Sequence, residues 1–96
     1  AGYAEGLKIL RQQLAESPDD AERMNAVGYS LLSQPSTLEE GYRLLAKANA
    51  ASPFDWAIVD SLGWAYYLYG DFAVAQEYLE AAAKGFASSP NPEVLD

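Results

Sequence analysis

The side chains that could do chemistry in this sequence are carboxylates, hydroxyls and aromatic rings, because the 96 residues include no His and no Cys. Two pairs of adjacent acids, Asp19/Asp20 and Glu39/Glu40, have the residue type needed for a general acid and a general base. Both pairs stand where a helix is expected to begin, and carboxylates at that place complement the helix dipole and accept from free backbone amides. We therefore interpret these acids as capping residues.

No other pattern in the sequence predicts a reaction. Glu77 and Glu80 lie three residues apart on one predicted helix, but a third metal ligand is missing, so a solvated face is the simpler interpretation. A Gly-rich phosphate loop is also missing. We expect no catalytic residue, no cofactor and no metal site, and we do not expect an enzyme.

Charge limits the class of partner. The net charge is -8, and the segment from Asp55 to Ala83 holds five acids and no Lys or Arg. Such a surface repels nucleic acid and anionic membranes, and it suits a protein or peptide partner that is apolar or basic. No apolar run approaches the roughly 20 residues of a membrane span. The sequence begins at Ala1 without Met, so we interpret it as a processed or excised piece of a longer chain.

Apolar residues recur every three and four positions, which predicts an all-α fold. Clusters of Ser, Pro, Gly and Asp divide the chain into five expected helices, at 2–16, 20–33, 37–51, 56–69 and 72–86, and Asn91-Pro92 is expected to begin a sixth. Three helix starts carry capping signals: Asp19 with Glu22, a capping box at 36–39 (Ser-Thr-Leu-Glu), and Asp71 ahead of Phe72.

The chain also repeats itself. Gly28-Tyr29 and Gly63-Trp64 are 35 residues apart, and so are Pro18 and Pro53. Self-similarity at this spacing is typical of stacked helical hairpins.

The second repeat resembles the tetratricopeptide repeat family in a run of positions: Leu62-Gly63, Tyr66, Gly70-Asp71-Phe72, Ala75, Leu79 and Ala82. The first repeat matches at Val27-Gly28, Leu45, Ala48 and Pro53, and departs with Leu31 for the usual Tyr, Gly41 for the usual Ala, and one extra residue in the turn at 34–36. In this pattern Gly63 and Ala75 are small where two helices cross, and Tyr66 lies in the repeat core.

The resemblance implies a right-handed α-solenoid of about five helices and a stub. Residues 1–18 would be the second helix of a truncated preceding repeat, 19–53 and 54–90 two full repeats, and 91–96 the start of a further truncated repeat. The truncated ends would expose apolar faces, through which copies of the chain could associate into a homo-oligomer.

In this family the first helix of each repeat lines a concave groove. The resemblance therefore implies a partner-binding surface, with these candidate residues: Asn25, Tyr29, Leu32, Asp60, Ser61, Trp64, Tyr67 and Leu68. Tyr and Trp suit a binding surface because they offer large rigid contact area with a polar tip. A second interpretation stays open for Trp64 and Tyr67, which could pack against a following repeat.

The resemblance implies a protein–protein interaction scaffold, part of a longer chain, that holds a peptide or protein segment on an aromatic and acidic groove. The best-known members of this family clamp an acidic peptide with basic side chains. Glu22 and Asp60 are negatively charged, which is the wrong sign for such a clamp. The alternative function is structural self-association by stacking or dimerisation of the repeats. The stretch VDSLGWAYYLYGD is similar to C-terminal repeats of bacterial members, several of them periplasmic lipoproteins, which favours a bacterial source and the cell envelope over the cytoplasm.

Overall fold

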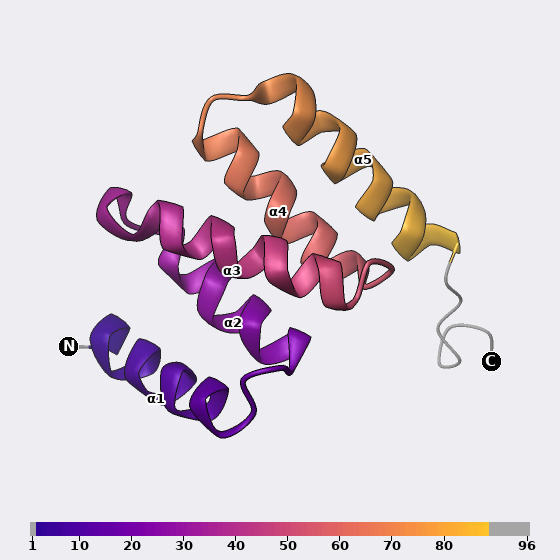
Figure 1. Cartoon of the computed structure of the whole chain (residues 1–96). Coiled ribbons are helices and arrows are strands. Elements are labelled where there is room, and N and C mark those ends of the chain that lie inside the picture. Colours follow the sequence, from indigo (N-terminus) through magenta and orange to yellow (C-terminus); the bar gives the residue numbers. More distant parts are fainter. Residues whose placement is uncertain (1, 89–96) are drawn as a thin grey trace.

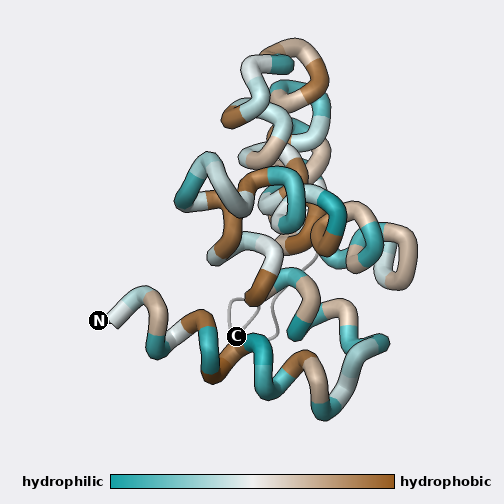
Figure 2. Tube along the Cα trace, turned by 60° about the vertical axis from the view of Figure 1, so that its left-hand side comes forward, coloured by the Kyte–Doolittle hydropathy of each residue, from teal (hydrophilic) through white to brown (hydrophobic). Residues whose placement is uncertain are grey.

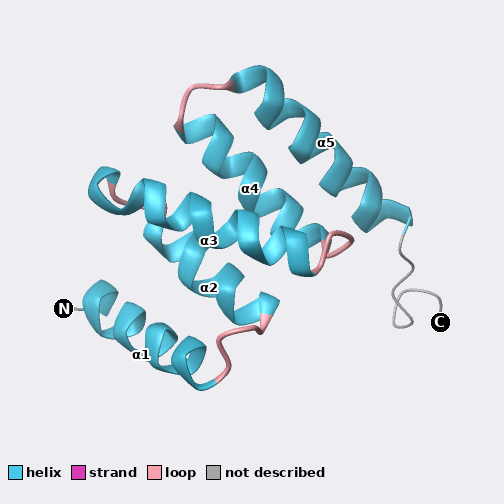
Figure 3. Ribbon diagram, in the orientation of Figure 1, coloured by secondary structure: helices cyan, strands magenta, loops and turns pink. Residues whose placement is uncertain are grey.

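The computed structural model describes residues 2–88, and within that range the chain forms five α-helices, one 3-10 turn and no strand (Figure 3). The helices are α1 (Gly2–Glu16), α2 (Ala21–Leu31), α3 (Leu38–Ala51), α4 (Trp56–Leu68) and α5 (Phe72–Ser88), and the 3-10 turn η1 (Pro35–Thr37) joins α2 to α3.

The helices form two hairpins, α2 with α3 and α4 with α5, and the second helix of the first hairpin packs against the first helix of the second (Figure 1). Helix α1 lies against α2, so each helix mainly contacts its neighbours along the chain. The expectation of an all-α fold made of helical hairpins is confirmed. The sixth helix expected at Asn91-Pro92 lies outside the described residues.

Aspartates begin three of the helices. Asp20 Oδ1 accepts from the backbone amides of Glu22 and Arg23 at 2.9 and 3.2 Å, and Asp55 accepts from that of Ala57 at 3.1 Å. Asp71 accepts from the amide of Val74 at 3.4 Å, as expected. The cap of α2 is thus Asp20 and not Asp19, because Asp20 is the residue whose extended backbone turns its carboxylate toward the free amides.

The capping box expected at 36–39 does not form. Thr37 is the N-cap of α3, but its side chain makes no capping bond and its hydroxyl donates instead to the carbonyl of Leu31 at 2.7 Å. The extra residue in this turn is taken up by η1, which carries the hydroxyl back to the end of α2. Thr37 therefore ties the two helices of the first hairpin together.

Gly70 ends α4 in the left-handed conformation, with φ of +85°, as its place after the helix requires. Its amide donates to the carbonyl of Tyr67 at 2.9 Å, and the amide of Asp71 donates to that of Tyr66 at 3.0 Å. This pair of bonds satisfies carbonyls at the helix end and directs the chain at once into α5.

Two helices differ from their expected bounds: α2 ends two residues before the expected position, and α5 runs two residues beyond it.

The core lies between the two hairpins. Figure 2 shows apolar residues recurring along the helices between polar ones, the pattern that buries one face of each. Less than a tenth of each of the following hydrophobic residues is exposed: Met24, Val27, Leu31, Leu32, Leu45, Ala48, Ile58, Val59, Leu62, Ala65, Ala75 and Ala82. These residues come from α2 to α5, whereas α1 has no buried residue.

Glycines set how closely the hairpin helices approach. A Cβ added to Gly41 of α3 would lie 2.6 Å from the carbonyl oxygen of Gly28 in α2, so neither residue can carry a side chain there. In the second hairpin a Cβ on Gly63 would lie 2.8 Å from the side chain of Leu79, and Ala75 is buried. The prediction of a close helix crossing is confirmed at Gly63. Gly85 makes room for the Trp56 ring in the same way.

Tyrosines fill the seam between the hairpins. The hydroxyls of Tyr42 in α3 and Tyr66 in α4 are 3.2 Å apart, and their rings meet edge to face with centroids at 5.5 Å. Tyr69 and Tyr78 pack on this pair, with centroids 5.7 Å from Tyr42 and 5.1 Å from Tyr66 respectively. Tyr66 thus lies in the repeat core, as expected. The hydrogen bond with Tyr42, followed by burial, raises the pKa of Tyr66 well above its ordinary value, because both favour the neutral phenol.

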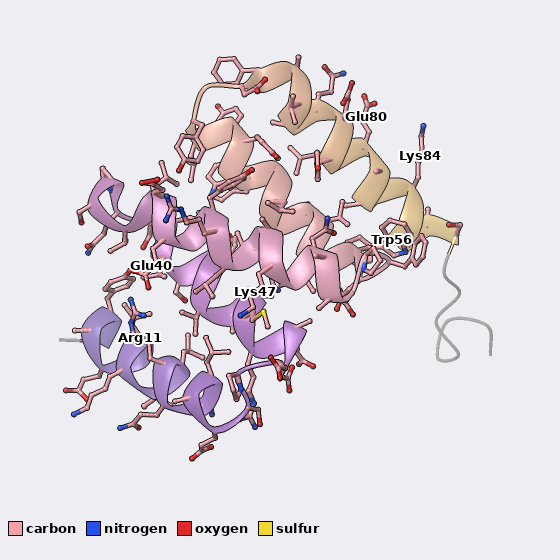
Figure 4. The ribbon with its side chains drawn as sticks, viewed as in Figure 1. Arg11, Glu40, Lys47, Trp56, Glu80 and Lys84 are labelled. Carbon is pink, nitrogen blue, oxygen red and sulfur yellow. The ribbon has the colours of Figure 1, made fainter. Side chains whose placement is uncertain are left out.

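Polar contacts hold α1 in place. Arg11 donates to both carboxylate oxygens of Glu40 in α3, at 3.0 and 3.2 Å, and Figure 4 shows the two side chains pointing toward one another. The hydroxyl of Tyr3 donates to the carbonyl of Ser30 at 2.9 Å. Leu14 packs against the core at the far end of the helix. The two polar contacts are exposed, so each contributes little to stability.

The Gly41–Gly28 contact generates the first prediction. Gly41→Ala should lower the free energy of unfolding by about 1–3 kcal/mol, because the new methyl group meets backbone that cannot move aside. Urea unfolding followed by circular dichroism measures the change. Gly6→Ala is the control: nothing lies within 4 Å of the added Cβ in α1, so stability should stay equal or rise by about 0.5–1 kcal/mol. Equal stability of the Gly41 variant and wild type would contradict the close crossing.

The tyrosine seam generates a pH prediction. Because the folded-state pKa of Tyr66 is raised above its unfolded value, this residue stabilises the fold fully below about pH 10, and the stabilisation is lost as the pH rises toward the folded-state pKa. Unfolding free energy measured with urea should therefore decline above about pH 10, and Tyr66→Phe should flatten that decline. Tyr29→Phe, which replaces an exposed tyrosine, should keep the wild-type slope. An unchanged decline in the Tyr66 variant would show that the seam does not control alkaline stability.

Candidate binding surface

The first helices of the two hairpins, α2 and α4, contact one another, and a hollow of about 320 Å³ lies on their shared surface. Its lining consists of Asn25, Ala26, Tyr29, Ala57, Asp60, Ser61 and Phe86. Four of the eight candidate residues, two from each helix, are thereby brought to one place. The spacing of 35 residues between the equivalent positions 25 and 60, and again between 26 and 61, is what aligns them across the two helices.

Asp60, Ser61 and Asn25 bring hydrogen-bond acceptors to this hollow. Asp60 is exposed and is the one charged residue of the lining. The Ser61 hydroxyl donates to the carbonyl of Ala57 at 3.0 Å, which leaves its oxygen free to accept. The amide oxygen of Asn25 is buried and has no hydrogen-bond partner among the described residues. The hollow is therefore suited to groups that donate.

Trp64 and Tyr67 form a separate aromatic surface further along α4. Their rings stack with centroids 5.1 Å apart and planes 9° from parallel, and Phe72 packs on Tyr67 at 5.2 Å. All three side chains remain partly exposed. Stacking keeps the rings in one orientation, so a partner would not have to order them.

Two of the candidate binding residues, Leu32 and Tyr67, do not lie on the α2–α4 surface where they were expected. Leu32 is only 4% exposed and belongs to the core with Leu45, Leu62 and Ala65. Leu32 is the C-cap of α2 and keeps a helical backbone, and its side chain lies against Gly41 of α3, where the missing Cβ leaves room for it. It is therefore buried and not available to a partner. Tyr67 lines a hollow on the α5 side and not the α2–α4 hollow, while Leu68, the last residue of α4, is partly exposed.

Phe86 is a lining residue that sequence reasoning missed. It comes from the last turn of α5, a helix not expected on this surface, and its side chain is 56% exposed. Helix α5 continues to Ser88 and lies close to α4 because Gly85 admits the Trp56 ring, and this carries Phe86 to the α2–α4 surface. The sequence signal that could have indicated it is the unusual length of the last helix.

Larger apolar hollows lie on the outer helices. One, of about 600 Å³, is on α1 and includes Tyr3, Leu7, Lys8 and Arg11. The other, of about 440 Å³, is on α5 and includes Tyr67, Phe72, Leu79 and Glu80. Helices α1 and α5 are at opposite ends of the helix row in Figure 1. Both ends therefore present apolar surface with charged residues at its margin.

Among residues 2–88 no group of three or more acidic side chains is placed to hold a metal ion. None of the five described helices combines the length and apolar character that crossing a membrane requires.

Comparison with known proteins finds one informative relative. No protein-family model matches the chain. Over 87 residues, 91% of the chain, the sequence is 39% identical to a TPR repeat-containing protein of Pseudomonas aeruginosa. The chain spans 14% of that relative's length.

Proposed function

Because the chain belongs to the tetratricopeptide repeat family, we propose that it is a protein-interaction segment whose α2–α4 surface binds a stretch of another polypeptide. The observation that carries this proposal is the hollow between α2 and α4, where residues at equivalent repeat positions meet. A surface built by both repeats favours a partner long enough to contact both, such as an extended peptide segment.

The side chains on this surface have the character of a binding site. Tyr29 lines the hollow and is 52% exposed, and the stacked Trp64 and Tyr67 form a separate exposed aromatic surface further along α4. Exposed aromatic rings next to a few polar groups are typical of residues that dominate binding energy. With Asp60 as the charged residue of the hollow and a net charge of -8, the partner is apolar or basic.

Selection of peptides tests this function. A library of random twelve-residue peptides, displayed on phage, is selected against the immobilised chain, and the affinity of the enriched peptides is measured by calorimetry. We expect enriched peptides to be apolar or basic, and Tyr29→Ala to weaken their binding about tenfold or more, because it removes exposed aromatic area at the hollow.

Phe54→Ala provides the matched control for that measurement. Phe54 is 80% exposed but lies in the turn before α4 and does not line the α2–α4 hollow, so its loss should leave affinity unchanged. Failure to enrich any peptide, or equal effects of the two variants, would contradict the proposed function.

The apolar hollows at the two ends favour a second candidate function, association between copies of the chain. The α1 hollow includes Lys8 and Arg11, and the α5 hollow includes Glu80, so an end-to-end arrangement would bring together apolar surface and opposite charges. Such a contact joins two different surfaces, and it extends beyond a dimer unless the arrangement closes.

Light scattering over a concentration series tests this second candidate. The mass of the wild type should rise with concentration, and Phe72→Ser should lower it toward the monomer because it places a polar group in the α5 hollow. Phe86→Ser is the control, since Phe86 has similar exposure on the same helix but lies in the other hollow. A monomer at every concentration would reject self-association.

A further inference from the structure

The α2–α4 hollow has an unusual balance of hydrogen-bonding groups. Asp60 brings an exposed carboxylate. Ser61 is only 5% exposed but lines the hollow, and its oxygen can accept because its own hydrogen is committed to the carbonyl of Ala57. Neither Lys nor Arg belongs to the lining. A bound group that donates several hydrogen bonds would therefore find acceptors, whereas a carboxylate would meet repulsion.

The charge of Asp60 is not neutralised by the protein. Within residues 2–88 the ion pairs join Arg11 to Glu40, Arg23 to Glu16 and Asp20, and Arg43 to Glu39, and Asp60 takes part in none of them. Asp60 also caps no helix, since it lies in the middle of α4. A structural role that would explain this carboxylate is therefore not evident in the fold.

Aromatic rings stand at the same hollow. Tyr29 comes from α2 and Phe86 from α5, and both are more than half exposed. Aromatic faces attract cations, and a planar guanidinium also stacks on them while its fork donates two bonds to a carboxylate. Rings together with an unpaired carboxylate suit arginine better than the compact, strongly hydrated ammonium of lysine.

We propose that the hollow formed by Tyr29, Asp60, Ser61 and Phe86 receives an arginine side chain of the bound polypeptide. The guanidinium donates to the Asp60 carboxylate, its plane packs on the aromatic rings, and its alkyl stem covers Ala26 and Ala57. The inference rests on the proposed function, because the arginine belongs to the polypeptide that the surface holds. It narrows the apolar or basic partner to one with an arginine at a defined position.

A tripeptide titration tests the pocket without knowledge of the natural partner. The ¹⁵N-labelled chain is titrated with N-acetyl-Ala-Arg-Ala-amide, and with the same peptide in which neutral citrulline replaces Arg. We expect saturable amide shifts around residues 25–29, 57–61 and 86 with the arginine peptide, and much smaller shifts with citrulline. A lysine peptide should bind more weakly than the arginine peptide. Shifts of equal size with citrulline and arginine, or none that saturate, would overturn the proposal.

Two variants with the same charge change locate the interaction. Asp60→Asn should weaken binding of the arginine peptide about tenfold, because it removes the charged acceptor. Glu5→Gln is the matched control, since it removes one negative charge from exposed α1, away from the hollow, and should leave the affinity unchanged. Equal weakening by both variants would mean that net charge, and not this pocket, attracts the peptide.

The outcomes separate this inference from the proposed function. If display selects peptides whose binding needs Tyr29 but the arginine tripeptide gives no saturable shift, the groove function stands and the arginine pocket is rejected. If neither assay shows binding at this surface, both are rejected. If the tripeptide shifts residues of the α5 hollow instead, the arginine pocket is rejected in favour of a site at the end of the helix row.

Discussion

The rest of the structure depends on how closely α2 and α3 approach one another. Their backbones meet at Gly28 and Gly41, and a methyl group at the crossing would collide with a carbonyl oxygen. This distance fixes the orientation of the first hairpin, and the orientation decides where Tyr42 presents its ring to the second hairpin. The contact between Tyr42 and Tyr66 joins α3 to α4, and the α2–α3 crossing extends this placement to α2 and α4, which form the α2–α4 hollow. The close approach of Gly28 and Gly41 therefore influences the geometry of the surface that we propose to bind a partner.

Much of this arrangement could be predicted from the sequence because it follows from local and periodic features. The spacing of 35 residues between Gly28 and Gly63 indicated two equivalent hairpins, and the residues around Gly63 indicated the close crossing and the packing of Tyr66 against the core. The same spacing placed Asn25 beside Asp60 and Ser61 across two helices. Periodicity is informative here because each helix contacts mainly its neighbours along the chain, so few long-range contacts had to be known.

What could not be predicted depends on details that periodicity does not contain. The capping box predicted from Ser36 to Glu39 does not form, because Ser36 lies within the 3-10 turn and Thr37 becomes the N-cap of α3. The Thr37 hydroxyl donates to the carbonyl of Leu31, which only the turn brings near. Leu32 was expected on the binding surface, but its side chain packs into the core over Gly41, a contact between helices that the period does not contain. Phe86 reaches the hollow because Gly85 leaves space for the Trp56 ring, so that the end of α5 lies close to α4. Helix ends are set by contacts across the turn, and these differ between repeats with similar sequences.

The weak attachment of α1 means that local unfolding begins at this helix. This helix buries no residue completely. It is held by the Arg11–Glu40 ion pair, the Tyr3 hydrogen bond, the contacts of Arg23 with Gln13 and Glu16, and the packing of Leu14, most of them at the surface. The free energy needed to detach it is therefore much smaller than that needed to separate α2 to α5, which share the core. Local stability forms a gradient along the chain, lowest at α1 and rising toward the seam between the hairpins. Transient release of α1 would uncover the part of the α2 surface that α1 covers, while the α2–α4 hollow would stay intact. The α1 contact and the binding surface thus lie on different faces of α2.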